Sequence, residues 1–551
     1  MKVKPLLQSI HPSTFLQDYL TACGVKDVDE YLNASFCDCD NPWDYPNMQE
    51  AVDRFHKAIE QKEKIGVLVD VDADGLCSSS LIYNFIKSIS PDQPIVYFMH
   101  AGKQHGLVQS KEENIVQQVV DNNIQLMIVP DAGTNDDEAC SILKAQGIDV
   151  LILDHHEITN ENPNAIIINH HLGNGLNTAL SGTGVTYKFV RAYCDQYKYA
   201  VGYNYLDLVA TSLVTDICDM TSVENRVYMQ YGFNNLQNPM LKAMYDNFNS
   251  RGNNQVGVAW GVGPKINAVF RGGTMEVKNA MFQAMVGEYD IDETIQLLKD
   301  THSGQSKIVD QVVKEIKPNL DLSQKVLIGY TDVKNKSYAG LIANKLTGEY
   351  NKPSIILREL NPTTWTGSMR SPVDIAHEIN ESGLATCQGH ESASGIWFPK
   401  SNLDKLIEWF DRLDLSVESI KPVTACITPK QITLSICEAC EDNILLWGSS
   451  EGSKIVQPKF YITFETTPDK VTVFAKRTKT VKFTFGDVSI LKFRAKADDV
   501  EMLQSEKCRV EVLVTLETNE WNGNITPQAK VEEWEINKVE DKGEESWEDL
   551  F

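Results

Sequence analysis

The segment IGVLVDVDADG, residues 65–75, decides the fold of the first half of the chain. Its first five residues are apolar and rich in β-branched side chains, which is typical of a strand buried on both faces of a sheet. Asp70, Asp72 and Asp74 alternate directly after this run, and Gly75 follows them. The segment therefore predicts a buried strand that ends in a turn crowded with carboxylates.

The alternation of short apolar runs with helix-like segments continues as far as Val185. Runs of strand length occupy residues 125–129, 150–153 and 166–168, and the periodic segments at 79–88 and 112–120 indicate helices. Continuous apolar strands that alternate with helices predict a parallel sheet covered on both faces.

Acidic and histidine residues stand at the ends of these strands. Asp131 follows the second strand, Asp154-His155-His156 follows the third, and the later apolar run LVATSLVTDICDM ends near Asp216. Ligands of open parallel sheets bind outside the carboxyl ends of the strands, so we expect these side chains to meet in one crevice. Carboxylates this close repel one another unless cations neutralise them. Oxygen ligands with one or two imidazoles favour Mn²⁺ or Mg²⁺, and a pair of such ions forms a site for attack at phosphorus.

Plainer interpretations exist for each motif taken alone. A single aspartate at a strand end is most often a helix cap or a turn residue, and paired histidines can be buried core residues. The sequence DVDADG also resembles a calcium loop, but Leu81 stands where such a loop needs a glutamate. Coincidence at four separate places favours the metal site.

The remainder of the chain changes character several times. Helical patterns fill residues 231–318, a second α/β block follows with strands near 326–328 and 354–357, and alternating strands dominate beyond residue 424. We expect an α/β protein with these parts: an N-terminal segment 1–45, a catalytic domain 46–230, connecting helices 231–318, a second α/β domain 319–423, a small β-barrel 424–537 and an acidic tail 538–551.

Two segments of the second α/β block have the composition of a phosphate site. WTGSMRS, residues 365–371, and CQGHESASG, residues 387–395, combine small residues with Arg370 and His390. Small residues let a backbone approach an anion, and arginine offers two parallel donors. An arginine beside serine is also common on ordinary surfaces, and Asn344 and Lys345 are weaker candidates.

A basic stretch stands out in the β-rich part. Residues 470–496 contain six lysines and two arginines against one acidic residue, with four phenylalanines among them. A basic groove with stacking aromatics holds single strands without reading their sequence. The alternative is that the phenylalanines form a core and the lysines protect strand edges. The candidate single-strand contacts are Lys476, Arg477, Lys479, Lys482, Lys492 and Arg494.

The formal net charge of −25 over 551 residues argues against a protein coated in basic charge, such as a ribosomal or chromatin protein. A nucleic-acid enzyme with one basic groove stays compatible with it. No signal peptide or membrane span is apparent, and the twelve cysteines are scattered. We expect a protein of the cytoplasm, or of a host cytoplasm if the source is viral.

These motifs together resemble the DHH phosphoesterase family and, within it, the branch of single-strand-specific exonucleases, over nearly the whole chain. The residues 70–75, Asp131, Asp154-His155-His156 and Asp216 match its four motifs. The resemblance implies metal ligands at Asp72, Asp74, Asp131, His155 and Asp216. It gives His156 a place at the second metal or the scissile phosphate, and Asp70 and Asp154 supporting roles.

The resemblance extends to substrate binding. The segment 264–268 with Arg271 resembles the connecting-helix signature, and Gln388-Gly389 stands where the family has two glycines before the histidine. The implied phosphate-binding residues are Ser368, Arg370, Gly389, His390, Asn267 and Arg271.

The function implied is a 5′→3′ single-stranded DNA exonuclease that uses two divalent cations, Mn²⁺ or Mg²⁺, and releases nucleoside 5′-monophosphates in repair, recombination or replication. The alternatives are a hydrolase of short oligoribonucleotides or cyclic dinucleotides, and an inactive scaffold of the same fold. Expected partners are single-stranded DNA and a single-strand-binding protein or helicase; we expect a monomer and no membrane association. The acidic tail 538–551 is expected to contact a partner, to cover the basic groove or simply to aid solubility.

Overall fold

The computed structural model describes residues 1–102, 104–107, 114–201, 203–248, 252–333, 335–390, 392–415, 420–475 and 478–539. The chain divides into two compact units, one of residues 41–216 and 231–418 and the other of residues 1–40, 217–230 and 419 onward. Lys476, Arg477 and residues 540–551 of the predicted tail lie outside the described residues, as does the side chain of His390. Within the described ranges, the helices are too short or too polar to cross a bilayer.

The first unit opens with a five-stranded sheet in the order β3-β2-β4-β5-β6, in which every pairing is parallel. This confirms the parallel sheet expected from the apolar runs, and adds β3, which the sequence did not indicate. The elements are α3 (Met48–Glu60), β2 (Ile65–Val69), α4 (Ala73–Ile89), β3 (Ile95–Met99), α5 (Ile115–Asp121), β4 (Leu126–Pro130), α6 (Asp137–Ala145), β5 (Asp149–Leu153), β6 (Ile166–Ile168), α7 (Gly182–Tyr197) and α8 (Leu206–Thr215).

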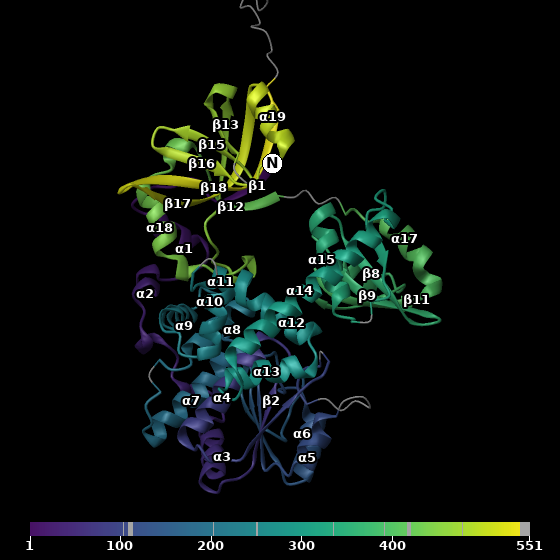
Figure 1. The fold of residues 1–551 in the computed structure, drawn as a ribbon. Helices are drawn as coiled ribbons and strands as arrows, with labels where there is room; N and C mark the ends of the chain where they lie inside the picture. Colours follow the sequence, from purple (N-terminus) through teal and green to yellow (C-terminus); the bar gives the residue numbers. More distant parts are fainter. Residues whose placement is uncertain are drawn as a thin grey trace, which may run out of the picture. The chain divides into compact units, whose positions relative to one another are not determined.

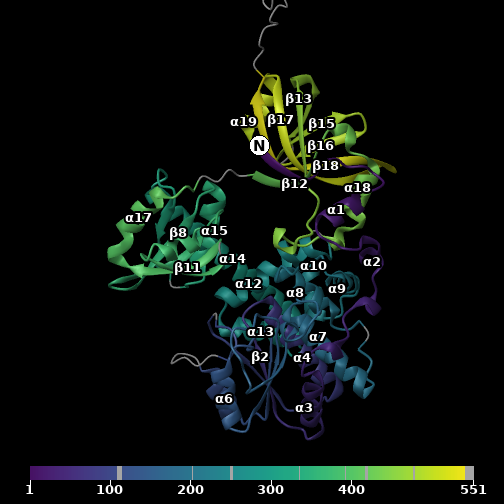
Figure 2. The same cartoon turned by 180° about the vertical axis from the view of Figure 1, so that it is seen from behind.

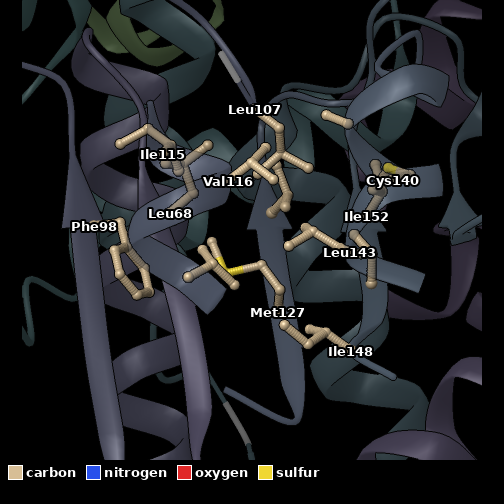
Figure 3. Close-up of a cluster of buried hydrophobic side chains, with 14 of the residues drawn as sticks. Leu68, Phe98, Leu107, Ile115, Val116, Met127, Cys140, Leu143, Ile148 and Ile152 are labelled. Atoms are coloured by element: carbon tan, nitrogen blue, oxygen red, sulfur yellow. The ribbon is translucent and has the colours of Figure 1, made fainter. Parts of the chain in front are cut away.

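Helices cover both faces of this sheet, as the continuous apolar strands require. Helices α3, α4 and α7 pack on one face, while α5 and α6 lie on the other (Figure 1). Under α5 and α6, Leu68, Met127 and Ile152 of neighbouring strands interlock with Val116 and Leu143 (Figure 3). This packing therefore fixes the point at which each strand ends. It thereby also fixes the position of the residues that follow each strand.

A helical segment connects this sheet to a second one. Its helices are α10 (Pro239–Phe248), α11 (Gln255–Gly257), α12 (Gly263–Gly272), α13 (Met275–Met285) and α14 (Ile291–Ile316), with a π-helical turn, η4 (Val258–Val262), before α12. The second block contains β7 (Leu327–Tyr330), α15 (Tyr338–Tyr350), β8 (Ser354–Asn361), β9 (Thr364–Arg370), α16 (Ala376–Glu381), β10 (Thr386–His390), β11 (Ala393–Pro399) and α17 (Leu403–Arg412).

The second sheet has the order β10-β11-β9-β8-β7, with only the β7–β8 pair parallel. Side chains alternate across β8: Ile356 packs with α15, whereas Ile355 and Leu357 share a core with α17. The sheet therefore separates α15 from α17, as the view from behind also shows (Figure 2). The strands and helix expected here from the sequence are confirmed.

The other unit is built on one eight-stranded sheet in the order β1-β12-β13-β17-β18-β16-β15-β14. The N-terminal β1 pairs in parallel with β12, a pairing that the sequence did not indicate. The elements are β1 (Lys2–Leu7), α1 (Phe15–Ala22), α2 (Val28–Asn33), β12 (Ile420–Ile427), α18 (Leu434–Asp442), β13 (Phe460–Thr466), β14 (Val471–Ala475), β15 (Lys479–Phe485), β16 (Val488–Lys492), α19 (Ala497–Ser505), β17 (Cys508–Trp521) and β18 (Asn524–Lys538); α9 (Val223–Asn234) begins in this unit. The β-rich C-terminal part is confirmed, and its closure as a barrel stays a prediction.

Candidate metal centre and phosphate sites

Carboxylates from three elements surround the imidazole of His155, which follows β5. His155 Nε2 lies 3.2 Å from Asp131 Oδ1 at the end of β4, 3.8 Å from Asp74 Oδ2 in the first turn of α4, and 3.7 Å from Asp216 Oδ2 after α8. We call these four residues the His155 cluster. Its members are four of the five predicted metal ligands, so the expected meeting of separate strand and helix ends occurs.

Asp131 adopts an unusual backbone conformation. Its φ of +63° is left-handed, and its N–H donates to the Leu153 carbonyl oxygen at 2.8 Å. Left-handed backbone in a residue other than glycine is held only where the surroundings impose it, and such strain gathers at functional sites. The turn therefore holds the Asp131 carboxylate against His155 at a cost in local conformational energy.

The N-terminal turn of α7 holds Asp74 in place. The N–H groups of Gly182 and Thr183 donate to Asp74 Oδ2 and Oδ1 at 2.7 and 2.8 Å, and the Thr183 hydroxyl donates at 2.5 Å. A β-carbon on Gly182 would lie only 2.3 Å from Asp131 Oδ1, so only glycine fits there. The glycine-containing turn at residues 181–185 thus brings a helix N-terminus directly against two of the carboxylates.

Asp154 organises the two histidines. Its Oδ1 accepts hydrogen bonds from the His155 N–H at 2.7 Å and from His156 Nδ1 at 2.8 Å, and its Oδ2 accepts from the Thr134 N–H at 3.0 Å. Burial alone would raise the pKa of Asp154, but the bond and charge of His156 hold it well below its usual range. The same hydrogen bond raises the pKa of His156 to about 9. Asp154 thus supports the site, and His156, half-exposed, presents Nε2 outward.

The charged forms of the carboxylates in the centre are unfavourable when no cation is bound. Burial, and then the charge of neighbouring aspartates, raises the pKa of Asp131 well above its usual range and raises that of Asp72. The same causes raise the pKa of Asp216 to about 6. Asp131 Oδ1 and Asp70 Oδ1 are buried and have no hydrogen-bond partner in the part of the chain that the structure describes. Hard oxygen atoms in this state fit divalent cations, which would neutralise the charge and satisfy both atoms.

A second cluster lies beside the first and includes a residue that sequence reasoning missed. Asp70 and Asp72 after β2, together with His105 from the loop after β3, have ligand atoms within 4.8 Å of one another, and we call these three the His105 cluster. His105 Nδ1 lies 2.6 Å from Asp70 Oδ2, and this contact raises the pKa of His105. No strand or motif marks His105 in the sequence; only its histidine-glycine step distinguishes the loop.

The predicted connecting-helix residues lie near these clusters. Arg271, near the end of α12, interacts electrostatically with Asp72, and desolvation by the surrounding protein lowers its pKa although its side chain reaches solvent. Asn267 lies one turn earlier on α12, half-buried. The guanidinium of Arg370, at the end of β9, is close enough to Arg271 for that charge to contribute to its lowered pKa, after desolvation. Two neighbouring guanidinium groups favour an anion between them.

The remaining phosphate candidates lie on adjacent strands. Ser368 on β9 is paired with Gly395 on β11, and Gly389 on β10 is paired with Ser394. Gly389 has a φ of +130°, whereas Gln388 does not have positive φ, so the backbone requires glycine only at the second position. The departure Gln388-Gly389 is therefore compatible with the turn. Asn344 is exposed on α15, and Lys345 beside it forms an ion pair with Asp310.

The register of the β-rich sheet divides the basic stretch between the two faces of the sheet. Lys482 is paired with Leu491 and Thr472, on the opposite face from Val481 and its partner Lys492. Lys492 donates to the Glu532 carbonyl oxygen at 2.6 Å and lies over the ring of Trp534. Lys479, before Lys482 in the sequence, and Arg494, after it, are both exposed. Alternation of side chains along a strand forces this division.

The phenylalanines of this stretch also divide. Phe483 is buried, and both Phe483 and Phe485 pack against Phe464 with ring centroids 5.0 Å apart. Phe474 and Phe493 are about half exposed. The core interpretation therefore holds for two of the four, and the other two remain available to stack on a ligand.

Comparison with known proteins shows what this chain is similar to. Residues 64–213 match the family described as DHH family, N-terminal domain. The chain is 28% identical, over 94% of its length and 95% of the relative, to the Bacillus subtilis prophage protein YorK, whose name assigns it provisionally as a single-strand DNA-specific exonuclease. It is 23% identical to the single-stranded-DNA-specific exonuclease RecJ of Bacillus subtilis, over all of this chain and 72% of that one.

A solved structure agrees in fold. The crystal structure of RecJ in complex with Mn²⁺ from Thermus thermophilus superposes with a TM-score of 0.75 at 17% identity, covering 98% of this chain and 79% of that one. The resemblance drawn from the sequence motifs is thereby confirmed. Residues 64–213 match the DHH family, N-terminal domain, and the chain is similar over nearly its whole length to the RecJ exonucleases.

Proposed function

We propose that the protein is a divalent-metal-dependent 5′→3′ exonuclease of single-stranded DNA, which releases nucleoside 5′-monophosphates in repair, recombination or replication. The observation that carries the proposal is the His155 cluster, where acids from separate elements lie 3.2–3.8 Å from one imidazole. Relatives named as single-strand DNA-specific exonucleases support the substrate class. Four motifs of a hydrolytic family are complete in this chain, which supports an active enzyme.

The donor set suits a pair of Mn²⁺ or Mg²⁺ ions. Asp72, Asp74, Asp131, His155 and Asp216 are the proposed ligands. When bound, such ions supply Lewis acidity and lower the pKa of a coordinated water. The protein's own part is to hold the carboxylates rigid: the α7 N-terminus orients Asp74, and the left-handed turn orients Asp131. Pre-organised ligands need no rearrangement when charge develops on the phosphate.

His156 is placed to assist at the scissile phosphate. Its Nδ1 is committed to Asp154 at 2.8 Å, and a pKa of about 9 keeps the ring cationic at neutral pH. A cationic ring can donate from Nε2 to a phosphate oxygen and stabilise the added negative charge of the transition state. We therefore propose that His156 binds the reacting phosphate and that Asp70 and Asp154 support the site.

Arg271 and Arg370 form the proposed phosphate clamp, with Asn267, Ser368, Gly389 and His390 as further contacts. Each guanidinium is already partly desolvated, and the two repel each other when nothing lies between them. An incoming phosphate relieves that repulsion and accepts two parallel hydrogen bonds from an arginine. The clamp would hold the strand end while the neighbouring bond is hydrolysed.

We propose that the β-rich unit, as an OB-like domain, holds the rest of the strand. Exposed Lys479 and Arg494, half-buried Lys482, and the exposed ring of Phe474 on the Lys482 face support this. Lys492 is the weakest of the predicted contacts, because its amine is engaged by the protein itself. Binding through lysines and aromatics would not depend on sequence and would weaken with salt.

One assay tests the proposal against its alternatives. Purified protein with Mn²⁺ is given 5′- or 3′-labelled single-stranded DNA, duplex DNA and a dinucleotide. Mononucleotide release from the 5′ end of single strands is the expected result. Digestion of the dinucleotide alone would favour a hydrolase of short oligonucleotides, and binding of DNA without hydrolysis would favour an inactive scaffold. Either of these outcomes refutes the proposal.

A further inference from the structure

We propose that His105 is a ligand of the second divalent cation, which it holds together with Asp70 and Asp72. The inference rests on the proposed two-cation site and adds to it an imidazole from a loop that none of the family motifs of this chain includes. The ligand atoms of the three residues lie within 4.8 Å of one another. That spacing is what ligands on one octahedral ion require, since each lies about 2.0–2.3 Å from the metal.

An unsatisfied atom within the cluster points to a ligand. Asp70 is fully buried, and its Oδ1 has no hydrogen-bond partner among the described residues, while its Oδ2 lies 2.6 Å from His105 Nδ1. A buried carboxylate oxygen left alone costs about 1–3 kcal/mol or more, so native structures rarely keep one. A cation between Asp70, Asp72 and His105 would satisfy that oxygen and offset the repulsion between the two carboxylates.

Hydrogen bonds to other parts of the fold hold the loop that carries His105. Lys278 of α13 is buried, and its ammonium donates to the carbonyl oxygens of His100 and Ala101 at 3.1 and 2.8 Å. On the far side of His105, the N–H of Leu107 donates to Asp136 Oδ2 at 2.7 Å. Fixed anchors on both sides keep the imidazole at Asp70, and pre-organisation of this kind is expected of a metal ligand.

The two clusters have similar sets of candidate ligands. The His155 cluster has one imidazole with three carboxylates, and the His105 cluster has one imidazole with two. His105 remains 57% exposed although it contacts the buried Asp70. Each cation would then have one imidazole, and the one held by His105 would be the more open to substrate.

Manganese binding to the whole chain tests this assignment. Calorimetric titration with Mn²⁺ gives the number of ions, and electron spin echo modulation of bound Mn²⁺ detects coordinated imidazole nitrogen. For His105→Phe, which keeps a ring but no nitrogen, we expect one of two ions to bind at least about tenfold more weakly, with loss of one nitrogen coupling. The control is His377→Phe, because His377 is exposed on α16, where it forms an ion pair with Glu381.

The outcomes separate this inference from the proposed function. The His105→Phe variant could bind two ions with unchanged affinity and unchanged nitrogen coupling. That result would overturn the role of His105 and leave the exonuclease proposal standing. The same result with a raised KM for DNA would make His105 a substrate contact instead, and would equally overturn it. Absence of Mn²⁺ binding by the wild-type chain would overturn both. Thermal unfolding of each variant verifies that the fold is retained.

Discussion

Substitution of Asp131 separates its role in metal binding from its role in the fold. Asp131 is buried, its Oδ1 has no hydrogen-bond partner within the described ranges, and its φ is +63°. Asparagine keeps the size and adopts left-handed backbone readily, so Asp131→Asn removes the charge alone. Alanine removes the charge and also the short polar side chain that lets aspartate and asparagine tolerate left-handed backbone, which costs roughly 1–2 kcal/mol.

The expected results differ in sign between activity and stability. Cleavage of single-stranded DNA falls at least about 10³-fold in both variants, because a ligand to the cations contributes several kcal/mol to transition-state stabilisation. Without metal at pH 8, Asp131→Asn is at least as stable as the wild type, because burial and neighbouring aspartates raise the pKa of Asp131 and so disfavour its charge. Asp131→Ala unfolds roughly 2–4 °C below Asp131→Asn.

The measurements are single-turnover cleavage with 5′-labelled DNA and thermal unfolding with and without Mn²⁺. In the wild type Mn²⁺ raises the unfolding temperature, whereas in Asp131→Asn it raises it much less. Near-wild-type cleavage by Asp131→Asn, or an equal gain from Mn²⁺, would refute the assignment of Asp131 as a ligand. A metal-free Asp131→Asn protein clearly less stable than the wild type would refute the claim that the bare carboxylate is unfavourable.

Three further predictions concern packing, pH and the phosphate clamp. Gly182→Ala places a β-carbon 2.3 Å from Asp131 Oδ1 and should lower cleavage by about 10²-fold, whereas Gly304→Ala, with open space around it, should not; equal activities would contradict this. Because the pKa of Asp216 is raised to about 6, the metal-free protein loses stability as pH rises through 6 while Mn²⁺ affinity increases. Calorimetry at pH 5.5 and 7.5 in two buffers checks this, and pH-independent affinity would disprove it. Arg370→Lys should raise the KM for 5′-phosphorylated DNA about tenfold, since a bidentate donor is lost, while Arg358→Lys should not; an unchanged KM would remove Arg370 from the clamp.

The sequence predicted those parts of the fold that depend on local pattern. The four strands expected before residue 170 are present because continuous apolar runs can only be buried on both sides. The missing information was non-local: nothing in Lys2–Leu7 specifies pairing with β12, more than 400 residues later. The five predicted metal ligands follow buried strands or begin and end helices, so the sheet brings them together.

The residues that sequence reasoning misplaced or missed lie where the sequence pattern does not determine the position of a side chain in space. His105 lies in a loop, and its approach to Asp70 depends on the anchor that Lys278 provides from a helix about 170 residues away. Composition does not show how the basic stretch is distributed: Lys479 and Lys482 are an odd number of residues apart, and an extended strand points them in opposite directions. The composition showed which segment is basic, and only the register of the strands showed which face of the sheet each basic residue lies on.

The metal centre is also where the fold is least favourable by itself. Asp131 has left-handed backbone, Asp70 buries an oxygen that has no hydrogen-bond partner among the described residues, and neighbouring charges contribute to the raised pKa of Asp216. None of these features stabilises the metal-free chain, and all are relieved by cations. A cation that binds only the folded state adds stability as RT ln(1 + [M]/Kd), about 2.7 kcal/mol at one hundred times Kd. The strands that end at this centre should therefore exchange their amide hydrogens more slowly when Mn²⁺ is present, whereas the β-rich unit, whose described residues contribute no ligand, should be unaffected. Equal protection of both units by Mn²⁺ would place the cations elsewhere.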